Sequence, residues 1–394
     1  MTTRASGFDA RFWLLISATF LGFLGIGTVL PALGPHIKHD LRGSDQVVGS
    51  VIGIFSFIAL GSRFFSGPLA DRRGRKVTFL AGLASCALAG AIYVLPIGLT
   101  GAYTARILQG FGEACLYTGA AAWAVELGGV ARSSQALGYV SSGIWGGISA
   151  GPVIGALAGS FAHAAWVQLL AASAAFGLAL LVREDFHPHA HKERRALKFS
   201  SLLVPGLAIG FVNVQYPVIA GFLILHLAQH GGAGRAAFST YALVILLSRF
   251  FLGSLPDRIH AAITFYCGIL AMAVGLLVIA AAPSPALSIA GTGLLGLGFS
   301  FPWSSVASTV LRRTPPERHG SVVSILSAFY DLFVGVSSFV AGRVADRHGY
   351  RAAFLMAAFA LIGAAIAARF VFQKPSSGQP EDEPVTAEPA PELA

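Results

Sequence analysis

Charged side chains are scarce in this sequence of 394 residues. Asp, Glu, Lys and Arg together make up 11% of the chain, whereas hydrophobic residues make up 55%. Soluble domains carry about 25% charged residues, so the composition argues against a soluble fold. Apolar runs of the length that a helix needs to cross a bilayer, about 20 residues, recur from Phe12 to Phe372. We therefore expect an all-α membrane protein.

Cysteine is rare as well, and the motifs of several enzyme classes are missing. Cys86, Cys115 and Cys267 lie inside apolar runs and lack the spacing of a metal site or a disulfide. The segment HPHAH (187–191) lies in a charged linker without a second ligand cluster, so we predict no metal site. The sequence contains no Gly-Lys-Ser/Thr phosphate loop and no recognisable nucleophile with its base, so we expect neither an enzyme nor a cofactor.

The net charge of +9 reflects basic residues in the short connections between apolar runs, where the positive-inside rule expects them, so we predict no nucleic-acid partner. With both termini in the cytoplasm, most of the 27 Lys and Arg residues fall on the cytoplasmic side. Arg347 and Arg351, in the last outer connection, run against this trend. We expect a multi-pass protein of the inner (plasma) membrane. Its first apolar run is too long for a cleavable signal.

The apolar runs predict twelve membrane helices in two sets of six. The first set is 12–34, 47–69, 77–98, 101–125, 136–159 and 165–182, and the second is 202–227, 238–255, 262–282, 286–311, 322–341 and 352–372. The corresponding domains are a cytoplasmic tail (1–11), a first six-helix bundle (12–182), a cytoplasmic linker (183–201), a second, pseudo-symmetric bundle (202–372) and a cytoplasmic tail (373–394). This last tail is rich in Pro and Glu, and we expect it to be disordered.

An internal repeat with an offset of 186 residues relates the two sets. SRFFSGPLADR, from Ser62, aligns with SRFFLGSLPDR, from Ser248, with eight identities in eleven positions. Two repeated halves that rock around a central site are typical of secondary transporters, so the repeat predicts alternating access. Arg63 and Arg249 are equivalent in the repeat. We expect structural roles for both, because long side chains near a membrane face can reach towards water.

The segment GPLADRRGRK (67–76) matches the pattern G-x-L-x-D-R-x-G-R-K, which is the cytoplasmic loop signature of the major facilitator superfamily. The matching positions are Gly67, Leu69, Asp71, Arg72, Gly74, Arg75 and Lys76. Glycines allow a tight turn at a helix end, and Asp71 can cap a helix N-terminus. The resemblance implies a gating latch, in which Asp71 faces the eleventh helix and an arginine pairs with Glu126. A purely topological anchor is the alternative.

The fourth predicted span contains ARILQGFGEA (105–114), which resembles the R-x-x-Q-G-x-G motif of the same family through Arg106 and Gln109. Glu113 follows Arg106 by seven residues and shares its helix face. Burial and a neighbouring cation act in opposite directions on the proton affinity of a carboxyl group, so Glu113 is our first candidate for a reversibly protonated site. A fixed Arg106–Glu113 pair is the alternative. Asp331, in the eleventh span, is a second acidic candidate.

The fifth predicted span carries G-x-x-x-G-P-x-x-G at Gly147, Gly151, Pro152 and Gly155. It resembles the glycine-proline motif of the drug and metabolite antiporters of the superfamily, although Ala156 stands where a second glycine is usual. The resemblance implies a bent helix at an interface and favours export. Ordinary kinked packing is the alternative.

Polar and aromatic residues interrupt two later spans. They are Asn213, Gln215 and Tyr216 in the seventh, and Phe299, Phe301 and Trp303 in the tenth. In the family the first, fourth, seventh and tenth helices line the transport cavity. An aromatic and weakly polar wall suits an amphipathic or aromatic solute.

These resemblances imply a secondary transporter that exports small organic compounds, a drug or a metabolite, in exchange for protons and acts as a monomer. A proton-coupled importer of a nutrient or metabolite is the alternative within the same class. A membrane sensor that kept the fold and lost transport is a remote alternative.

Overall fold

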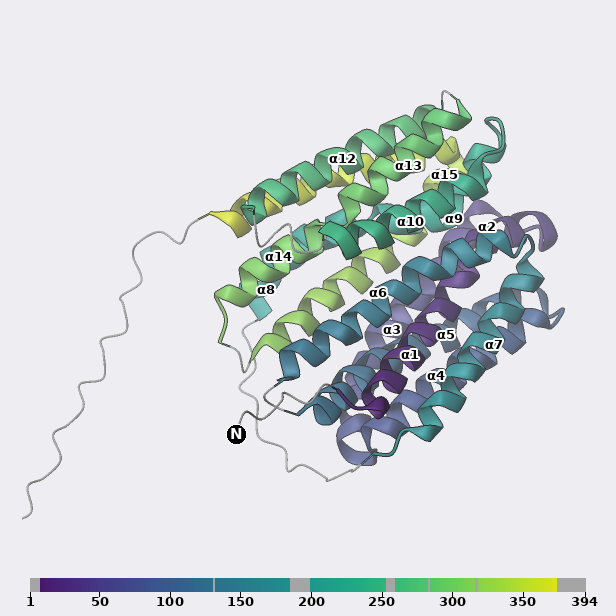
Figure 1. The fold of residues 1–394 in the computed structure, drawn as a ribbon. Coiled ribbons are helices and arrows are strands. Elements are labelled where there is room, and N and C mark those ends of the chain that lie inside the picture. The colour runs from purple at the N-terminus through teal and green to yellow at the C-terminus, as the bar shows by residue number, and fades with distance from the viewer. Residues whose placement is uncertain are drawn as a thin grey trace, which may run out of the picture.

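The structure, a computed structural model, describes residues 8–129, 132–184, 199–252, 259–282, 284–315 and 318–373, and these residues are largely helical (Figure 1). Within this part of the chain, ten helical segments are long and apolar enough to cross a membrane. Helix α5 (Gly98–Gly128) is not among the ten and carries Arg106 and Glu113 in its middle. Helix α15 (His319–Phe372) is one of the ten, but it turns at Gly349. Counting α5 and both parts of α15 gives the twelve predicted spans.

The first half begins with α1 (Ala10–Thr28), α2 (Leu30–Pro35) and the π-helical turn η1 (His36–Asp40). It continues with α3 (Asp45–Arg73), α4 (Arg75–Val94), α5, α6 (Ser133–Leu157) and α7 (Phe161–Leu181). The second half contains α8 (Phe199–Asn213), α9 (Gln215–Ala228), α10 (Gly234–Leu252), α12 (Ala261–Ala281), α13 (Pro285–Phe299), α14 (Pro302–Arg312) and α15. Most of the predicted linker (185–198), the C-terminal tail (374–394) and the 253–258 part of the repeat lie outside the described residues.

Several helix starts are fixed by side chains that accept a hydrogen bond from a free backbone N–H of the first turn. Asp9 accepts from Phe12 at the start of α1. Ser44, Ser160 and Ser284 cap α3, α7 and α13 in the same way, and all three have extended backbones. The sequence thus specifies where these membrane helices begin, even where hydropathy alone places a boundary several residues away.

Three membrane segments are broken near their middle. α1 gives way to α2 at Val29, α8 to α9 at Val214, and α13 to α14 at Ser300 and Phe301. Each break is followed within a few residues by a proline, which cannot donate a hydrogen bond to the preceding turn. The last two breaks fall where polar or aromatic residues interrupt the seventh and tenth predicted spans.

The predicted non-helical connection over 342–351 is wrong. The helix continues through these residues, and only Gly349 leaves helical geometry, with φ 79° and ψ 169°. Glycine adopts such a positive φ without the steric cost that a Cβ imposes. A single glycine therefore reverses the chain where the sequence suggested a loop of ten residues.

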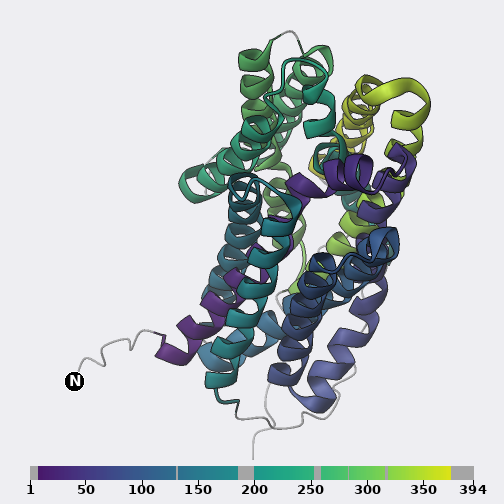
Figure 2. The ribbon, with the colours of Figure 1, turned by 90° about the vertical axis from the view of Figure 1, so that its right-hand side faces the viewer.

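Figure 1 shows the helices of the first half, coloured purple to blue, beside those of the second half, coloured green to yellow. We call the end of the molecule at which α1 begins and α15 ends the near end, and the opposite one the far end. At the far end, Tyr350 donates to Asp45 with a distance of 3.0 Å between Oη and Oδ1. Figure 2 shows the turn of α15 beside the purple segment that leads from α1 to α3.

The contact between α3 and α15 is close because small residues line it. A Cβ on Gly49 would clash with the carbonyl oxygen of Ser338 and would lie 2.8 Å from the Cα of Gly342. Large apolar side chains point outwards elsewhere, for example Phe359 at 74%, Leu270 at 65% and Leu170 at 63% exposure. An apolar outer surface, combined with small residues where helices pack closely, is the pattern expected for a protein in lipid.

Candidate functional site

Arg63 of α3 lies between two carboxylates. Its Nε donates to Oδ2 of Asp331 on α15 at 2.8 Å, and its Nη2 lies 3.4 Å from Oε1 of Glu113 on α5. The ring of Tyr117 lies 5.1 Å from the guanidinium carbon. The side chains of Arg63, Glu113 and Asp331 are 17%, 14% and 5% exposed. The structure thus gives Arg63 two anionic partners, of which Asp331 is buried and Glu113 is half-buried, whereas the sequence suggested that Arg63 reaches towards the membrane face.

This carboxylate cluster (Arg63, Glu113 and Asp331) joins the two halves of the protein. Arg63 and Glu113 come from the first half, and Asp331 comes from the second. With both acids ionised, two negative charges share one positive charge, so the cluster carries one net negative charge. A charge in a membrane interior costs about 2.5–3.5 kcal/mol on insertion scales. Binding of one proton would make the cluster neutral.

Arg106, the other basic candidate, does not pair with Glu113. It donates from Nε and Nη2 to the carbonyl oxygens of Val51 and Ile52, at 3.3 and 3.2 Å, and from Nη1 to Oε1 of Gln109 at 2.9 Å. The ring of Phe55 lies 4.3 Å from its guanidinium carbon. The predicted alternative of a fixed Arg106–Glu113 pair is therefore wrong. Arg106 is 3% exposed and ties α5 to α3.

Gln109 extends this network within the first half. It is fully buried and donates to Oε1 of Gln168 on α7 at 2.8 Å. Gln168 in turn donates to the carbonyl oxygen of Cys86 on α4 at 3.0 Å. The network connects α3, α5, α7 and α4, and its hydrogen bonds satisfy the polar groups of Arg106 and Gln109. These two predicted site residues therefore hold helices together in the described structure.

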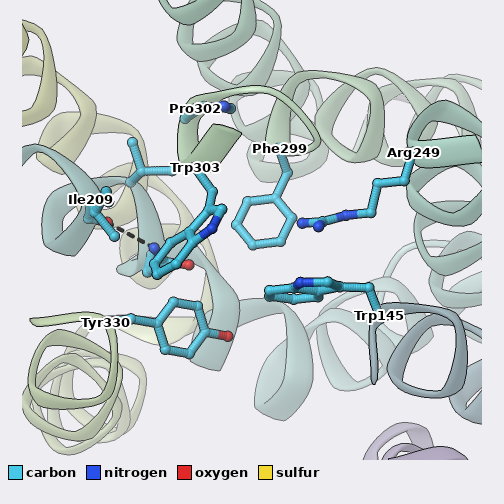
Figure 3. Close-up of a pocket in the computed structure, with 9 residues that line it drawn as sticks. Trp145, Ile209, Arg249, Phe299, Pro302, Trp303 and Tyr330 are labelled. Atoms are coloured by element: carbon cyan, nitrogen blue, oxygen red, sulfur yellow. Dashed lines mark hydrogen bonds between the residues drawn. The ribbon is translucent and has the colours of Figure 1, made fainter. Parts of the chain in front are cut away.

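A second arginine, Arg249 of α10, lies in an aromatic cavity between the halves (Figure 3). Its guanidinium carbon lies 4.0 Å from the centre of the Trp145 ring on α6. Phe299 flanks the guanidinium on another side, as Figure 3 shows. The nine lining residues of this cavity include no acid. They are Trp145, Ile209, Val212, Asn213, Arg249, Phe299, Pro302, Trp303 and Tyr330.

The positive charge of Arg249 is poorly compensated. Its Nε is buried and has no hydrogen-bond partner among the described residues. A cation over an indole ring gains about 0.5–2 kcal/mol. This gain is smaller than the cost of placing a charge in the membrane, about 2.5–3.5 kcal/mol. Arg106, by contrast, finds three oxygen acceptors. Of these two arginines, Arg249 is the one whose charge is open to a ligand.

An adjoining cavity shares Trp145, Phe299 and Tyr330 with the first. Its wall is mostly apolar and aromatic, and it too contains no acid. It is lined by Leu30, Trp145, Ile148, Ser149, Pro152, Tyr216, Ile219, Ala220, Phe238, Tyr241, Ala242, Ile245, Phe299 and Tyr330. We call the two together the Arg249 cavity. They lie between α2 and α6 of the first half and α8, α9, α10, α13, α14 and α15 of the second.

The predicted residues of the seventh and tenth spans fall at different places. Tyr216, Phe299 and Trp303 line the Arg249 cavity, and Asn213 lines it while it donates to the carbonyl oxygen of Ile209 at 2.7 Å. Gln215 is fully buried and donates to the hydroxyl of Tyr241 at 3.1 Å, which fixes one wall. Phe301 precedes α14 at the helix break and is not among the lining residues.

Sequence reasoning missed Trp145, Tyr241 and Tyr330, and it assigned Arg63 and Arg249 structural roles. The repeat offset contains the missing signal. An offset of 186 pairs Glu113 with Phe299 and Trp145 with Asp331, and it pairs Tyr117 with Trp303. The acids around Arg63 are thus replaced by aromatic residues around Arg249.

The signature 67–76 is helical except at Gly74, which has φ 104°. Gly67, Leu69, Asp71 and Arg72 belong to α3, so the expectation that Asp71 caps a helix is wrong. The start of α4 is capped instead by Glu184, which follows α7. Its carboxylate accepts hydrogen bonds from the backbone N–H of Arg75 at 2.6 Å and of Lys76 at 3.2 Å. The negative charge of a carboxylate at this position is also stabilised by the positive N-terminal end of the α4 dipole.

Arg75 forms an ion pair with Glu126 at the end of α5, which is the pairing implied by the family resemblance. Lys76 donates to the carbonyl oxygens of Leu180 and Val182. Asp71 is exposed, and the structure gives it no partner among the described residues. The latch between Asp71 and the eleventh helix is therefore not formed in this arrangement.

The glycine-proline motif of α6 packs against α1. A Cβ on Gly147, Gly151 or Gly155 would clash with the carbonyl oxygen of Phe20, Leu24 or Thr28, respectively. Pro152 lies next to Gly27, with its Cδ 3.0 Å from a Cβ built there. Three glycines spaced by four residues thus let two helix backbones approach closely along one face.

Among the described residues, no group of three or more His, Cys, Asp or Glu side chains is placed to hold a metal ion. The HPHAH segment lies outside these residues.

The family model of the Major Facilitator Superfamily matches residues 15–232 and 207–394. The chain belongs to the Major Facilitator Superfamily. It is similar to an uncharacterized MFS-type transporter of Salmonella typhimurium, with 28% identity over 368 residues that cover 89% of this chain and 94% of the relative. The chain is thus an MFS transporter and not an enzyme.

Solved structures of other superfamily members share the fold. The nucleoside transporter NupG superimposes with a TM-score of 0.70 at 13% identity and covers 93% of this chain and 100% of its own. A POT family transporter in complex with 5-aminolevulinic acid gives 0.75 at 13% identity, with 92% and 96% coverage. At this identity the likeness establishes the fold of the chain.

Proposed function

We propose that this MFS transporter moves small organic compounds by alternating access and couples their movement to protons at the carboxylate cluster. The observation that carries this proposal is the position of Arg63 between Glu113 and Asp331. One proton changes the cluster from one net negative charge to neutral and weakens the ion pair that joins α3 to α15. Protonation is thereby linked to the contact that the halves must change when access alternates.

The arrangement of the halves supports an inward-facing state. Contacts between them run from Arg63–Asp331 in the middle to Asp45–Tyr350 at the far end, while Asp71 at the near end is exposed. With both termini in the cytoplasm, the far end is the outer one. The cavity then exchanges solute with the cytoplasm, and the outer gate is closed.

Export in exchange for protons is the direction that we propose first. Its support is the glycine-proline motif of α6, which resembles that of drug and metabolite antiporters and packs on α1 through Gly147, Gly151 and Gly155. Solute would bind from the cytoplasm, the halves would rock, and a proton from outside would occupy the cluster for the return step.

Uptake of a solute together with a proton is the second candidate, and one observation favours it. Arg249 is positively charged, and the cluster with both acids ionised carries one net negative charge, so the two sites attract opposite charges. Binding of a proton alone, or of an anion alone, changes the net charge of the interior by one. Joint binding leaves the net charge unchanged, which costs less in the membrane core than the addition of a single charge.

Everted membrane vesicles with an acidic interior test the function and its direction. Organic compounds are screened for proton movement with the wild type, Glu113→Gln and Asp331→Asn, and with Asp346→Asn as a control, because Asp346 is exposed on the same helix as Asp331. Exchange predicts proton efflux as compound enters the vesicle. Co-transport predicts that protons and compound leave together.

In either direction, both cluster variants should lose compound-driven proton movement, and the control should keep it. Glu113→Gln leaves one acid beside Arg63, so its cluster is neutral without a proton, and the rate of transport should become independent of pH. Compound transport without proton movement in the wild type would reject proton coupling.

A further inference from the structure

We propose that the Arg249 cavity is a subsite for the anionic group of an organic solute, a carboxylate or a similar acid on an aromatic or apolar body. This inference specifies the solute of the proposed transporter and rests on the proposed function only in taking the cavity as the transport site. Arg249 carries a permanent positive charge, and no acid lines its cavity.

The missing counter-charge is a property of the repeat. Arg63 and Arg249 are equivalent, and each is contacted by the equivalent position of the opposite half, Asp331 in one case and Trp145 in the other. Glu113, the second acid at Arg63, has Phe299 as its equivalent. The sequence therefore places anions around one arginine and rings around the other.

The guanidinium of Arg249 has unused hydrogen-bonding capacity. Trp145 stacks on one face of the guanidinium, and the Nε has no hydrogen-bond partner among the described residues. A planar guanidinium that stacks on a ring keeps its N–H groups in the plane, where a carboxylate accepts two of them side by side. The structure thus holds Arg249 by its face and leaves its Nε donor without a partner, and we expect an anion that enters the cavity to supply that partner.

The rest of the cavity selects the body of the solute. Tyr216, Tyr241 and Tyr330 supply rings that each carry a hydroxyl group, and Phe299 and Trp303 supply apolar rings. Such a wall accommodates an aromatic or apolar scaffold and offers only a few polar contacts.

Binding to the purified full-length protein in lipid nanodiscs tests this inference without transport. The probes are benzoate, 2-naphthoate and indole-3-acetate, each compared with its neutral primary amide, by calorimetric titration. We expect at least one acid to bind at least about tenfold more tightly than its amide, because the amide cannot form the charged bidentate contact.

The decisive variants are Arg249→Gln, Arg249→Lys and the control Arg235→Gln. Arg235 lies exposed at the start of the same helix, so its substitution removes the same charge outside the cavity. We expect Arg249→Gln to abolish the preference for the acid, Arg249→Lys to retain part of it, and the control to leave it unchanged. Thermal unfolding of each variant verifies that it is folded.

Three results would overturn the inference. These are equal affinity of the wild type for all acids and their amides, unchanged acid affinity in a folded Arg249→Gln variant, or no carboxylate binding at the solubility limit of every probe. Acid binding that depends on Arg249, combined with no proton movement in vesicles, would leave this inference intact and reject the proposed proton coupling. Compound-driven proton movement in vesicles, combined with no acid binding that depends on Arg249, would reject the anion subsite and leave the proposed proton coupling intact.

Discussion

Asp331 and Trp145 occupy equivalent positions of the repeat, 186 residues apart, and each contacts the arginine of the opposite half. Asp331 accepts from Arg63 at 2.8 Å, and Trp145 stacks on Arg249 at 4.0 Å. The equivalent contact is thus an ion pair at Arg63 and a cation–π pair at Arg249. We infer that the first contact serves protons and the second serves the solute.

This relationship predicts the effect of giving Arg249 the partner that Arg63 has. Trp145→Asp places a carboxylate beside Arg249, where it competes with a bound acid. Affinity for the acidic probes should fall by at least about tenfold, because an intramolecular ion pair occupies the guanidinium. Calorimetric titration measures the change.

Trp145→Asn is the matched control, since it removes the ring and adds no charge. Its affinity should fall less than that of Trp145→Asp. Equal losses in the two variants would mean that the ring matters and the charge does not, which contradicts the anion subsite.

Membrane potential should separate exchange from co-transport. Export of a monoanion in exchange for one proton moves two positive charges inwards per cycle, and each charge gains about 2.3 kcal/mol per 100 mV. Co-transport of one proton and one monoanion moves no net charge. In proteoliposomes, a potassium diffusion potential set with valinomycin should therefore accelerate the exchange mode and leave co-transport unaffected. A response to potential that is the same for a neutral amide would show that the solute's charge is not transported.

The packing of α6 on α1 should be sensitive to one methyl group. Gly151→Ala places a Cβ 2.5 Å from the carbonyl oxygen of Leu24, so the helices must separate. Overpacking of this kind costs about 1–3 kcal/mol, and the thermal unfolding temperature should fall. Gly138→Ala on the same helix is the control, because a Cβ there meets no atom within 4 Å. An unchanged unfolding temperature for Gly151→Ala would contradict the close contact.

Asp71→Asn should change the balance of conformations without changing stability. Asp71 is exposed here, so this arrangement loses no contact, while the arrangement in which it meets the eleventh helix loses one. The population that is closed at the far end should increase. Spin labels at Leu137 of α6 and Leu252 of α10 report the opening of the near end of the molecule. The two positions lie close to that end and in opposite halves.

The control for this measurement is Arg73→Gln, because Arg73 occupies an undefined position of the signature and is likewise exposed. Identical distance distributions in the wild type and in Asp71→Asn, with transport unaffected, would contradict the proposed latch between Asp71 and the eleventh helix.

The fold could be predicted from the sequence because its causes are local. Apolar length places the helices, the repeat at Ser62 and Ser248 relates the halves, and the polar and aromatic interruptions at Asn213 and Phe299 mark two of the three breaks. The turn at Gly349 was missed because hydropathy drops over ten residues there, while one glycine suffices to reverse the helix.

The site was only partly predictable, because its contacts are formed between halves. Glu113 and Asp331 were both identified as intramembrane acids, but nothing near them in the sequence points to Arg63, which is 50 residues from one and 268 from the other. Arg106 was the closer arginine along the helix, and backbone carbonyl groups of α3 satisfy it instead. Applying the repeat offset to each candidate would have paired Glu113 with Phe299 and Asp331 with Trp145.

The most direct test of the account is the simultaneous measurement of solute and proton flux in proteoliposomes that contain only this protein, with wild type, Glu113→Gln and Asp346→Asn compared. We predict that wild type and Asp346→Asn move protons only when solute moves, in a fixed ratio, and that Glu113→Gln moves solute without protons. Solute flux without proton flux in the wild type, or an unchanged ratio in Glu113→Gln, would contradict the assignment of the carboxylate cluster as the proton site.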